Sequence, residues 1–195
     1  MNQRAMITVS VRWKLLFLCL FLLNGCSAST VDNYPDRPIT IICPWSVGGA
    51  TDRTSRQLGV YLEQELGVPV NVINATGGRG VTGHSRGLNA RPDGYTLAII
   101  TGELNMLHWQ NLTKLTHRDA VPIVSLVDGA AAVFVKTDSP FQNMQELQDY
   151  VKTHPGKLTA TGTASGGIWH LALAGWLDFS ELNAEDIKWI PMNGA

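Results

Sequence analysis

Three glycine-rich turns, at positions 47–50, 77–80 and 162–167, hold the residues best suited to binding chemistry. Each turn follows a predicted strand and precedes a predicted helix. Such a turn directs several backbone N–H groups at one point, and the helix dipole adds partial positive charge there. The pattern therefore predicts an anion site that requires neither an arginine nor a metal ion. For any single turn, a tight connection between elements is an equally good explanation.

The elements around the first two turns alternate between strand and helix. Apolar runs at 39–43, 68–73 and 95–101 predict three strands. Helical spacing predicts one helix over 53–66 and a second that ends near Ala90. One face of the first helix carries the apolar residues Leu58, Tyr61, Leu62 and Leu66. This β-α-β-α-β order predicts a parallel sheet, at whose carboxyl edge ligands usually bind.

The second half of the chain has a mixed pattern. A short helix is expected over 104–112. A helix is expected to begin at Asn143, whose side chain and that of Glu146 resemble a capping box. The segment 168–177 is apolar on all sides and predicts a buried helix. Strands are predicted at 121–127, 131–136, 158–161 and 187–190.

The N-terminal segment predicts export. The basic residues Arg4, Arg12 and Lys14 precede an apolar run at 15–23, which is too short to span a bilayer but suits a signal peptide. The sequence 23–26 resembles a lipobox, so a lipid on Cys26 would hold the protein to a membrane. An ordinary cleaved signal is the alternative. Both predict a protein outside the cytoplasm, in the periplasm or at the cell surface.

Composition limits the remaining functions. Removing the three basic residues of segment 1–26 leaves 12 basic against 16 acidic residues, a net charge of −4. The chain has no basic stripe, which argues against a nucleic-acid partner. Only Cys43 remains after the export segment, so no internal disulfide is expected, and its apolar neighbours predict a buried strand residue. The five histidines lack metal-ligand spacing, so neither a metal nor another cofactor is predicted.

Several segments together resemble a known family. They are 34–39 (YPDRPI), 44–52 (PWSVGGATD), 77–83, 91–97 (RPDGYTL), 156–158 and 162–170. This combination resembles the substrate-binding proteins of tripartite tricarboxylate transporters, also called Bug receptors. The resemblance implies an α/β fold of the type II periplasmic binding protein kind, a two-lobed clamshell of parallel sheets with flanking helices. It also implies a monomeric receptor, not an enzyme, that captures a small carboxylate for a membrane permease.

The resemblance also implies which residues hold the carboxylate. The first-lobe residues would be Ser46, Val47, Gly48, Gly49, Ala50, Thr51, Thr101 and Gly102, and the second-lobe residues Gly162, Thr163, Ser165, Gly166 and His170. Asp52 is expected to cap the following helix, because its charge would repel an anion. A packed core position is an equally good interpretation of His170. The aromatic residues Trp45, Trp109 and Trp169 are candidate walls of the site, although core packing is the commoner role for tryptophan.

Two features depart from the family pattern. Arg79 places a charge in a turn where the family more often has small residues, and it could either reach the ligand or face water. The chain also ends where family members continue, so an incomplete second lobe is expected. The expected organisation is an export segment at 1–26, a first lobe at 27–103 and a partial second lobe at 104–195.

Two enzyme classes remain as alternatives. Gly78, Gly80 and Gly83 fit the dinucleotide fingerprint G-x-G-x-x-G, and Glu103 lies at the end of the next predicted strand. The fingerprint should directly follow its strand, whereas four residues intervene here. A serine hydrolase could use Ser46, but its nucleophile turn would need glycine where this chain has Pro44.

Overall fold

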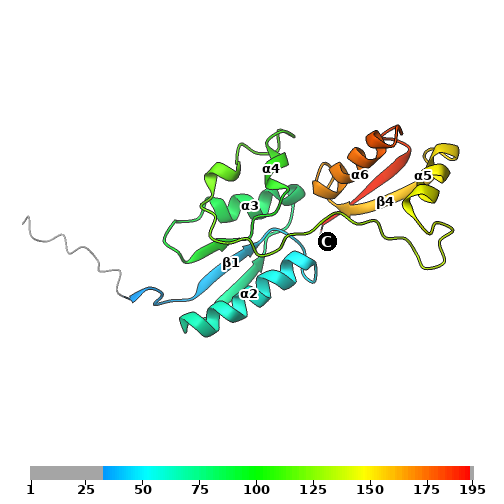
Figure 1. Ribbon diagram of the computed structural model, residues 1–195. Coiled ribbons are helices and arrows are strands. Elements are labelled where there is room, and N and C mark those ends of the chain that lie inside the picture. Colours follow the sequence, from blue (N-terminus) through cyan, green and yellow to red (C-terminus); the bar gives the residue numbers. More distant parts are fainter. Residues whose placement is uncertain (1–32, 194–195) are drawn as a thin grey trace, which may run out of the picture. The chain divides into compact units, whose positions relative to one another are not determined.

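The computed structural model describes residues 33–193 of the chain. The predicted signal segment 1–26, including Cys26, lies outside these residues. The described residues from Pro35 onward belong to one compact unit. None of the described helices is long and apolar enough to cross a membrane. The elements are β1 (Ile39–Cys43), α2 (Ala50–Leu66), β2 (Val70–Asn74), η3 (Gly78–Gly80), α3 (Val81–Leu88), β3 (Thr96–Ala98), α4 (Leu104–Leu107), η4 (His117–Asp119), α5 (Met144–Thr153), β4 (Leu158–Thr163), α6 (Ile168–Phe179) and β5 (Ile187–Met192) (Figure 1).

β1 is the central strand of a parallel sheet with the order β2-β1-β3. Ile41 lies level with Val72 on one side and with Leu97 on the other. Because β1 has a neighbour on both edges and helices on both faces, its residues Ile41 and Cys43 are fully buried. The predicted β-α-β-α-β order and the buried position of Cys43 are confirmed, although β3 is shorter than the expected strand at 95–101.

Two helical glycines show that α2 and α3 cover opposite faces of this sheet. A Cβ on Gly59 of α2 would lie 3.6 Å from Val72 Cγ2, and one on Gly87 of α3 would lie 2.5 Å from Ala98 Cβ. Val72 is level with Ile41, whereas Ala98 is level with the next residue of β1. Successive strand residues point to opposite faces. Figure 1 accordingly shows β1 between the two helices.

The limits of α2 follow from its end residues. The helix begins three residues before the expected Arg53 and ends where Gly67 adopts a left-handed conformation (φ 69°), as its C-terminal cap. The expected apolar face is only partly correct. Leu58 and Leu62 are half-buried, but Tyr61 is 58% exposed and does not join the core.

The second sheet pairs β4 and β5 in parallel, with Leu158 level with Ile187. The buried residues Leu147, Val151, Leu177 and Ile187 form one cluster that joins α5, α6 and β5. The predicted cap of α5 is confirmed. The Asn143 side chain accepts a hydrogen bond from the Glu146 backbone N–H at 3.0 Å.

Two predictions for the second half are wrong. The segments 121–127 and 131–136 contain no strand, and both are exposed throughout. A strand needs a neighbour for its N–H and C=O groups, and none of the described strands pairs with this part of the chain. Helix α6 is also not buried on all sides, because Leu177 is its only buried residue and Phe179 is 88% exposed.

Candidate ligand-binding site

Ser46 lies at the carboxyl end of β1 and directs two donors at one atom. Its backbone N–H and its Oγ–H both donate to the carbonyl oxygen of Asn193, at 3.2 and 3.0 Å. The turn that follows requires glycine, because Gly48 has a φ of 87°. The first N–H groups of α2 lie just beyond it and have no acceptor earlier in the helix. This edge of the sheet is therefore rich in hydrogen-bond donors.

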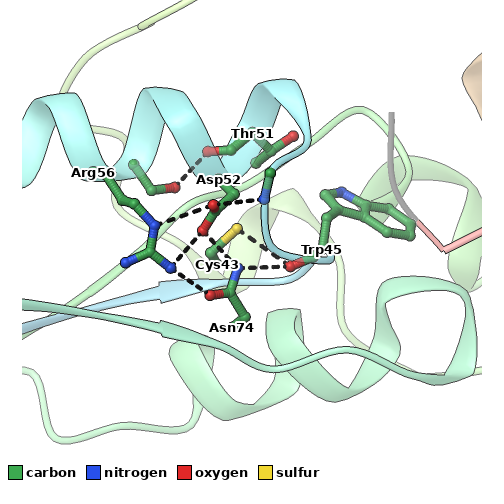
Figure 2. A network of polar contacts seen from close by, with 8 residues as sticks. Cys43, Trp45, Thr51, Asp52, Arg56 and Asn74 are labelled. Carbon is green, nitrogen blue, oxygen red and sulfur yellow. Dashed lines mark hydrogen bonds and ion pairs between the residues drawn. The ribbon is translucent and has the colours of Figure 1, made fainter.

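A buried carboxylate shapes the turn from within. Asp52 is 2% exposed, and its carboxylate accepts hydrogen bonds from the Gly48 N–H at 2.8 Å and from Asn74 Nδ2 at 2.8 Å. It also forms an ion pair with Arg56 at 2.9 Å. Figure 2 shows these contacts converging from α2, β2 and the turn. The expected cap role of Asp52 is not what the structure shows, because the N-cap of α2 is Gly49, without a side-chain cap bond, and Asp52 is the third residue of the helix. Asp52 instead holds the backbone of the turn that precedes its own helix.

The partners of Asp52 keep it ionised. The hydrogen bond from Arg56 is the main cause that lowers the pKa of Asp52 from 3.8 to about 2, and the bonds from Gly48 and Asn74 add to it against the cost of burial. Asn74 also donates to the carbonyl oxygen of Trp45 at 2.9 Å and accepts from Arg56. The negative charge next to the turn is therefore compensated by a nearby cation and by donors.

A second network links the loop after β3, which ends at Ala98, to the second glycine turn. Trp45 Nε1 donates to Thr101 Oγ1 at 3.2 Å, and the Thr101 N–H donates to His84 Nε2 at 3.2 Å. His84 Nδ1 lies 2.7 Å from the carbonyl oxygen of Gly80. These contacts define a neutral imidazole with its proton on Nδ1. Burial lowers the pKa of His84, which favours the same neutral form.

Residues of the third glycine turn lie against the first sheet. Ala164 shares a buried cluster with Cys43 and Trp45. A Cβ on Gly102 would lie 3.7 Å from Ile168 Cδ1, at the start of α6. The structure therefore brings three of the predicted regions together: the turn after β1, the loop after β3 and the turn after β4.

His170 is engaged within its own element. Its Nδ1 accepts a hydrogen bond from the Gly166 N–H at 2.9 Å, and its ring stacks on Trp189 with centroids 4.8 Å apart. Burial lowers the pKa of His170. The side chain therefore holds the third glycine turn in shape, and its predicted contact with a ligand stays a prediction.

The three candidate wall residues differ in their surroundings. Trp45 is 5% exposed and half-buried Trp169 lies on α6, whereas Trp109 is 80% exposed. The sequence reasoning missed four residues that hold the predicted ones in place: Arg56, Asn74, Gln110 and Asn193. Arg56 could have been found from its spacing, four residues after Asp52 on one helix face. The other contacts depend on the tertiary fold.

The enzyme alternatives gain no support from the geometry. Gly78 begins a short turn four residues after β2 ends at Asn74, so the dinucleotide fingerprint does not directly follow its strand. The Ser46 hydroxyl donates to a backbone carbonyl rather than to a histidine. Within residues 33–193, no three side chains among His, Cys, Asp and Glu are grouped to hold a metal ion.

Comparison with known proteins shows the family. The model for the tripartite tricarboxylate transporter family receptor matches residues 54–194. A UPF0065 protein of Cupriavidus necator is 34% identical over 145 residues, which are 73% of this chain and 44% of that protein. The protein BugT of Bordetella pertussis is 29% identical over 146 residues, which are 73% of this chain and 45% of that protein.

Solved structures share the fold. A TctC solute binding protein from Polaromonas, solved with no ligand, is 32% identical with a TM-score of 0.59, over 84% of this chain and 55% of that one. MatC from Rhodopseudomonas palustris, solved with bound malate, is 21% identical with a TM-score of 0.65, over 83% and 55%. This chain spans about half the length of the relatives it matches. It belongs to the tripartite tricarboxylate transporter receptor family.

Proposed function

We propose that this chain forms part of a periplasmic receptor that binds a small carboxylate reversibly and passes it to a membrane permease. One observation carries the proposal. The N–H and the hydroxyl of Ser46 converge on a single oxygen atom, the carbonyl oxygen of Asn193. We propose that a carboxylate oxygen of the ligand takes the place of this carbonyl oxygen, because both are hydrogen-bond acceptors of similar size. Two converging donors suit an anion better than a neutral group.

The charges near the turn also suit an anion. The carboxylate of Asp52 points its oxygens at Gly48, Asn74 and Arg56, so its charge is compensated before a ligand arrives. MatC, which shares the fold, was solved with malate, a small dicarboxylate. We propose that the other predicted residues around the three turns complete the contacts when the ligand is bound. Catalysis forms no part of this proposal.

The location is part of the same proposal. Receptors of this family act outside the cytoplasm, and the predicted signal at 1–26 fits that location. Anchoring through a lipid on Cys26, and function as a monomer, remain predictions. Proteolysis and mass spectrometry of the chain expressed in a bacterium would show whether Cys26 carries a lipid.

The test is a thermal-shift screen of the purified chain against acetate, malate, adipate and citrate. We expect the melting temperature to rise with at least one acid, because a ligand that binds only the folded state stabilises it. Gly49→Val should abolish this rise. Gly49 has a φ of −69°, which valine adopts without strain, so the added side chain would block the approach of the ligand.

Gly175→Val is the matched control. Gly175 lies on α6, and a Cβ there would meet nothing within 4 Å. We expect this variant to retain the shift of the unsubstituted chain. Equal shifts in the Gly49→Val variant and the control would exclude the turn as the site. A chain that melts cooperatively but responds to no acid would contradict carboxylate binding itself.

A further inference from the structure

Arg79 stands out in the second glycine turn. It has a φ of 60°, a left-handed conformation that glycine adopts readily, and its neighbours Gly77, Gly78 and Gly80 also have positive φ. A long charged residue thus occupies a backbone position that favours glycine. Such outliers persist where the surrounding structure or the function maintains them.

The Arg79 side chain is directed toward the third glycine turn. Its Nη1 donates to Gln110 Oε1 at 2.8 Å, and Gln110 Nε2 donates to the carbonyl oxygen of Gly166 at 2.9 Å. A Cβ on Gly166 would lie 2.6 Å from Gln110 Oε1, so only glycine allows this approach. Gln110 therefore connects the arginine to a turn that contributes predicted ligand contacts.

The other side of Arg79 lies near the first turn. A Cβ on the next residue, Gly80, would lie 3.2 Å from the Trp45 ring. Trp45 directly precedes Ser46, which carries the two converging donors. The backbone of the second turn therefore lies beside the residue that precedes Ser46, and the Arg79 side chain extends from this turn to Gln110.

The charge of Arg79 has only a neutral partner. Arg37 and Arg56 each pair with a carboxylate, Asp93 and Asp52 respectively. Within residues 33–193, no acidic side chain lies within ion-pair distance of Arg79. Gln110 accepts a hydrogen bond from one N–H of the guanidinium, so the other N–H groups of Arg79 remain available to a ligand. A guanidinium can bind a carboxylate through two parallel hydrogen bonds.

We propose that Arg79 is a specificity-determining residue that selects ligands with a second anionic group. This inference rests on the proposed function: the first carboxylate binds at the turn after β1, and Arg79 binds the second. The ligand class is then a short-chain acid with an anionic group at each end. A monocarboxylate of the same length would leave the guanidinium with its neutral partner alone.

The test compares acids of matched length by isothermal titration calorimetry on the purified full chain. Succinate and butyrate have four carbons, and adipate and hexanoate have six. We expect the better diacid to bind at least about tenfold more tightly than its monoacid, the usual effect of one charge-assisted hydrogen bond. Arg79→Gln should remove this preference by weakening the diacid while leaving the monoacid within about twofold.

Two further variants complete the design. Arg79→Gly relieves the left-handed backbone, so it should melt no lower than the unsubstituted chain and should also lose the preference. Arg86→Gln removes an exposed positive charge from α3 and should keep the preference.

The outcomes separate the two proposals. Carboxylate binding with no diacid preference, or with a preference that survives Arg79→Gln, would overturn the role of Arg79 and leave the proposed function intact. Failure of all four acids to bind the unsubstituted chain would overturn the role of Arg79, and the additional absence of a thermal shift with acetate, malate and citrate would overturn the proposed function.

Discussion

Replacing Asp52 with asparagine tests how the turn after β1 is held. The carboxylate oxygens of Asp52 accept from three groups: the Gly48 N–H, Asn74 Nδ2 and the Arg56 guanidinium. An asparagine has a similar shape but one acceptor oxygen, and its amide nitrogen would face donors. We therefore expect Asp52→Asn to break the ion pair and to leave at least one buried donor without an acceptor.

The magnitude follows from the pKa and from the contacts. Lowering the pKa of Asp52 from 3.8 to about 2 corresponds to about 2.5 kcal/mol. Because the Arg56 side chain is 48% exposed, solvent screening reduces this contribution to about 1 kcal/mol. An unsatisfied buried donor costs about 1 to 3 kcal/mol more. The loss is then about 2 to 4 kcal/mol, or about 5 to 12 °C in melting temperature for a chain of this size.

The assay is urea unfolding followed by circular dichroism at pH 7 and pH 3. Because folding lowers the pKa of Asp52, its stabilisation is complete above the unfolded value of 3.8 and is lost as the pH falls through about 2. The electrostatic part of the difference between the unsubstituted chain and Asp52→Asn should therefore fall by about half at pH 3.

Asp93→Asn is the matched control. Asp93 pairs with Arg37, but the two side chains are 38% and 56% exposed, so solvent screens the pair and the change should barely move the urea midpoint. If Asp52→Asn unfolded at the same urea concentration as this control, the Asp52 contacts would not stabilise the turn. A difference of the same size at both pH values would show that the ion pair contributes nothing.

Two further predictions concern the packing around the turn. Gly83→Ala should destabilise the fold by about 2 kcal/mol or more, because its Cβ would lie 2.4 Å from the backbone Cα of Pro44. Gly175→Ala is the control and should be neutral or stabilising, because its Cβ would meet nothing within 4 Å. The difference in melting temperature between the two variants tests this prediction. His84 should make stability fall as the pH drops below about 6.5, because burial lowers its pKa in the folded state only, so the unfolded chain gains the proton first. In His84→Asn this slope of melting temperature against pH should flatten, and an unchanged slope would assign it to another group.

The first sheet could be predicted because its sequence signals are local. The run Ile39–Cys43 is apolar throughout and is buried on both faces, as a central parallel strand should be. The glycines that end α2 and shape the turns adopt the left-handed conformations that only glycine takes easily. Both signals depend on a few neighbouring residues, so they can be recognised in the sequence without knowledge of the rest of the fold.

The second half could not be predicted in the same way, because its apolar residues depend on what lies beside them. The apolar residues of 121–127 and 131–136 indicate that these segments could form strands, but a strand forms only when another strand pairs with it. Likewise, the apolar circumference of α6 predicts burial on all sides, yet Leu177 is the one residue of this helix that is buried. An apolar pattern shows that a segment could be buried, but burial occurs only where another element of the fold packs against it.

The difference between local and tertiary signals also applies to the proposed site, whose location can be predicted from neighbouring residues but whose specificity cannot. Asp52 and Arg56 are four residues apart, so the sequence alone can indicate that the charge beside the turn is compensated and that an anion could approach. Gln110 contacts Arg79, which is 31 positions away in the sequence, and Gly166, which is 56 positions away. No local sequence pattern predicts these contacts. The proposed anion binding depends on backbone groups next to one another in the chain, whereas the proposed selection among anions depends on side chains that only the tertiary fold brings together. A variant that alters selectivity without altering stability should therefore be sought among these distant contacts.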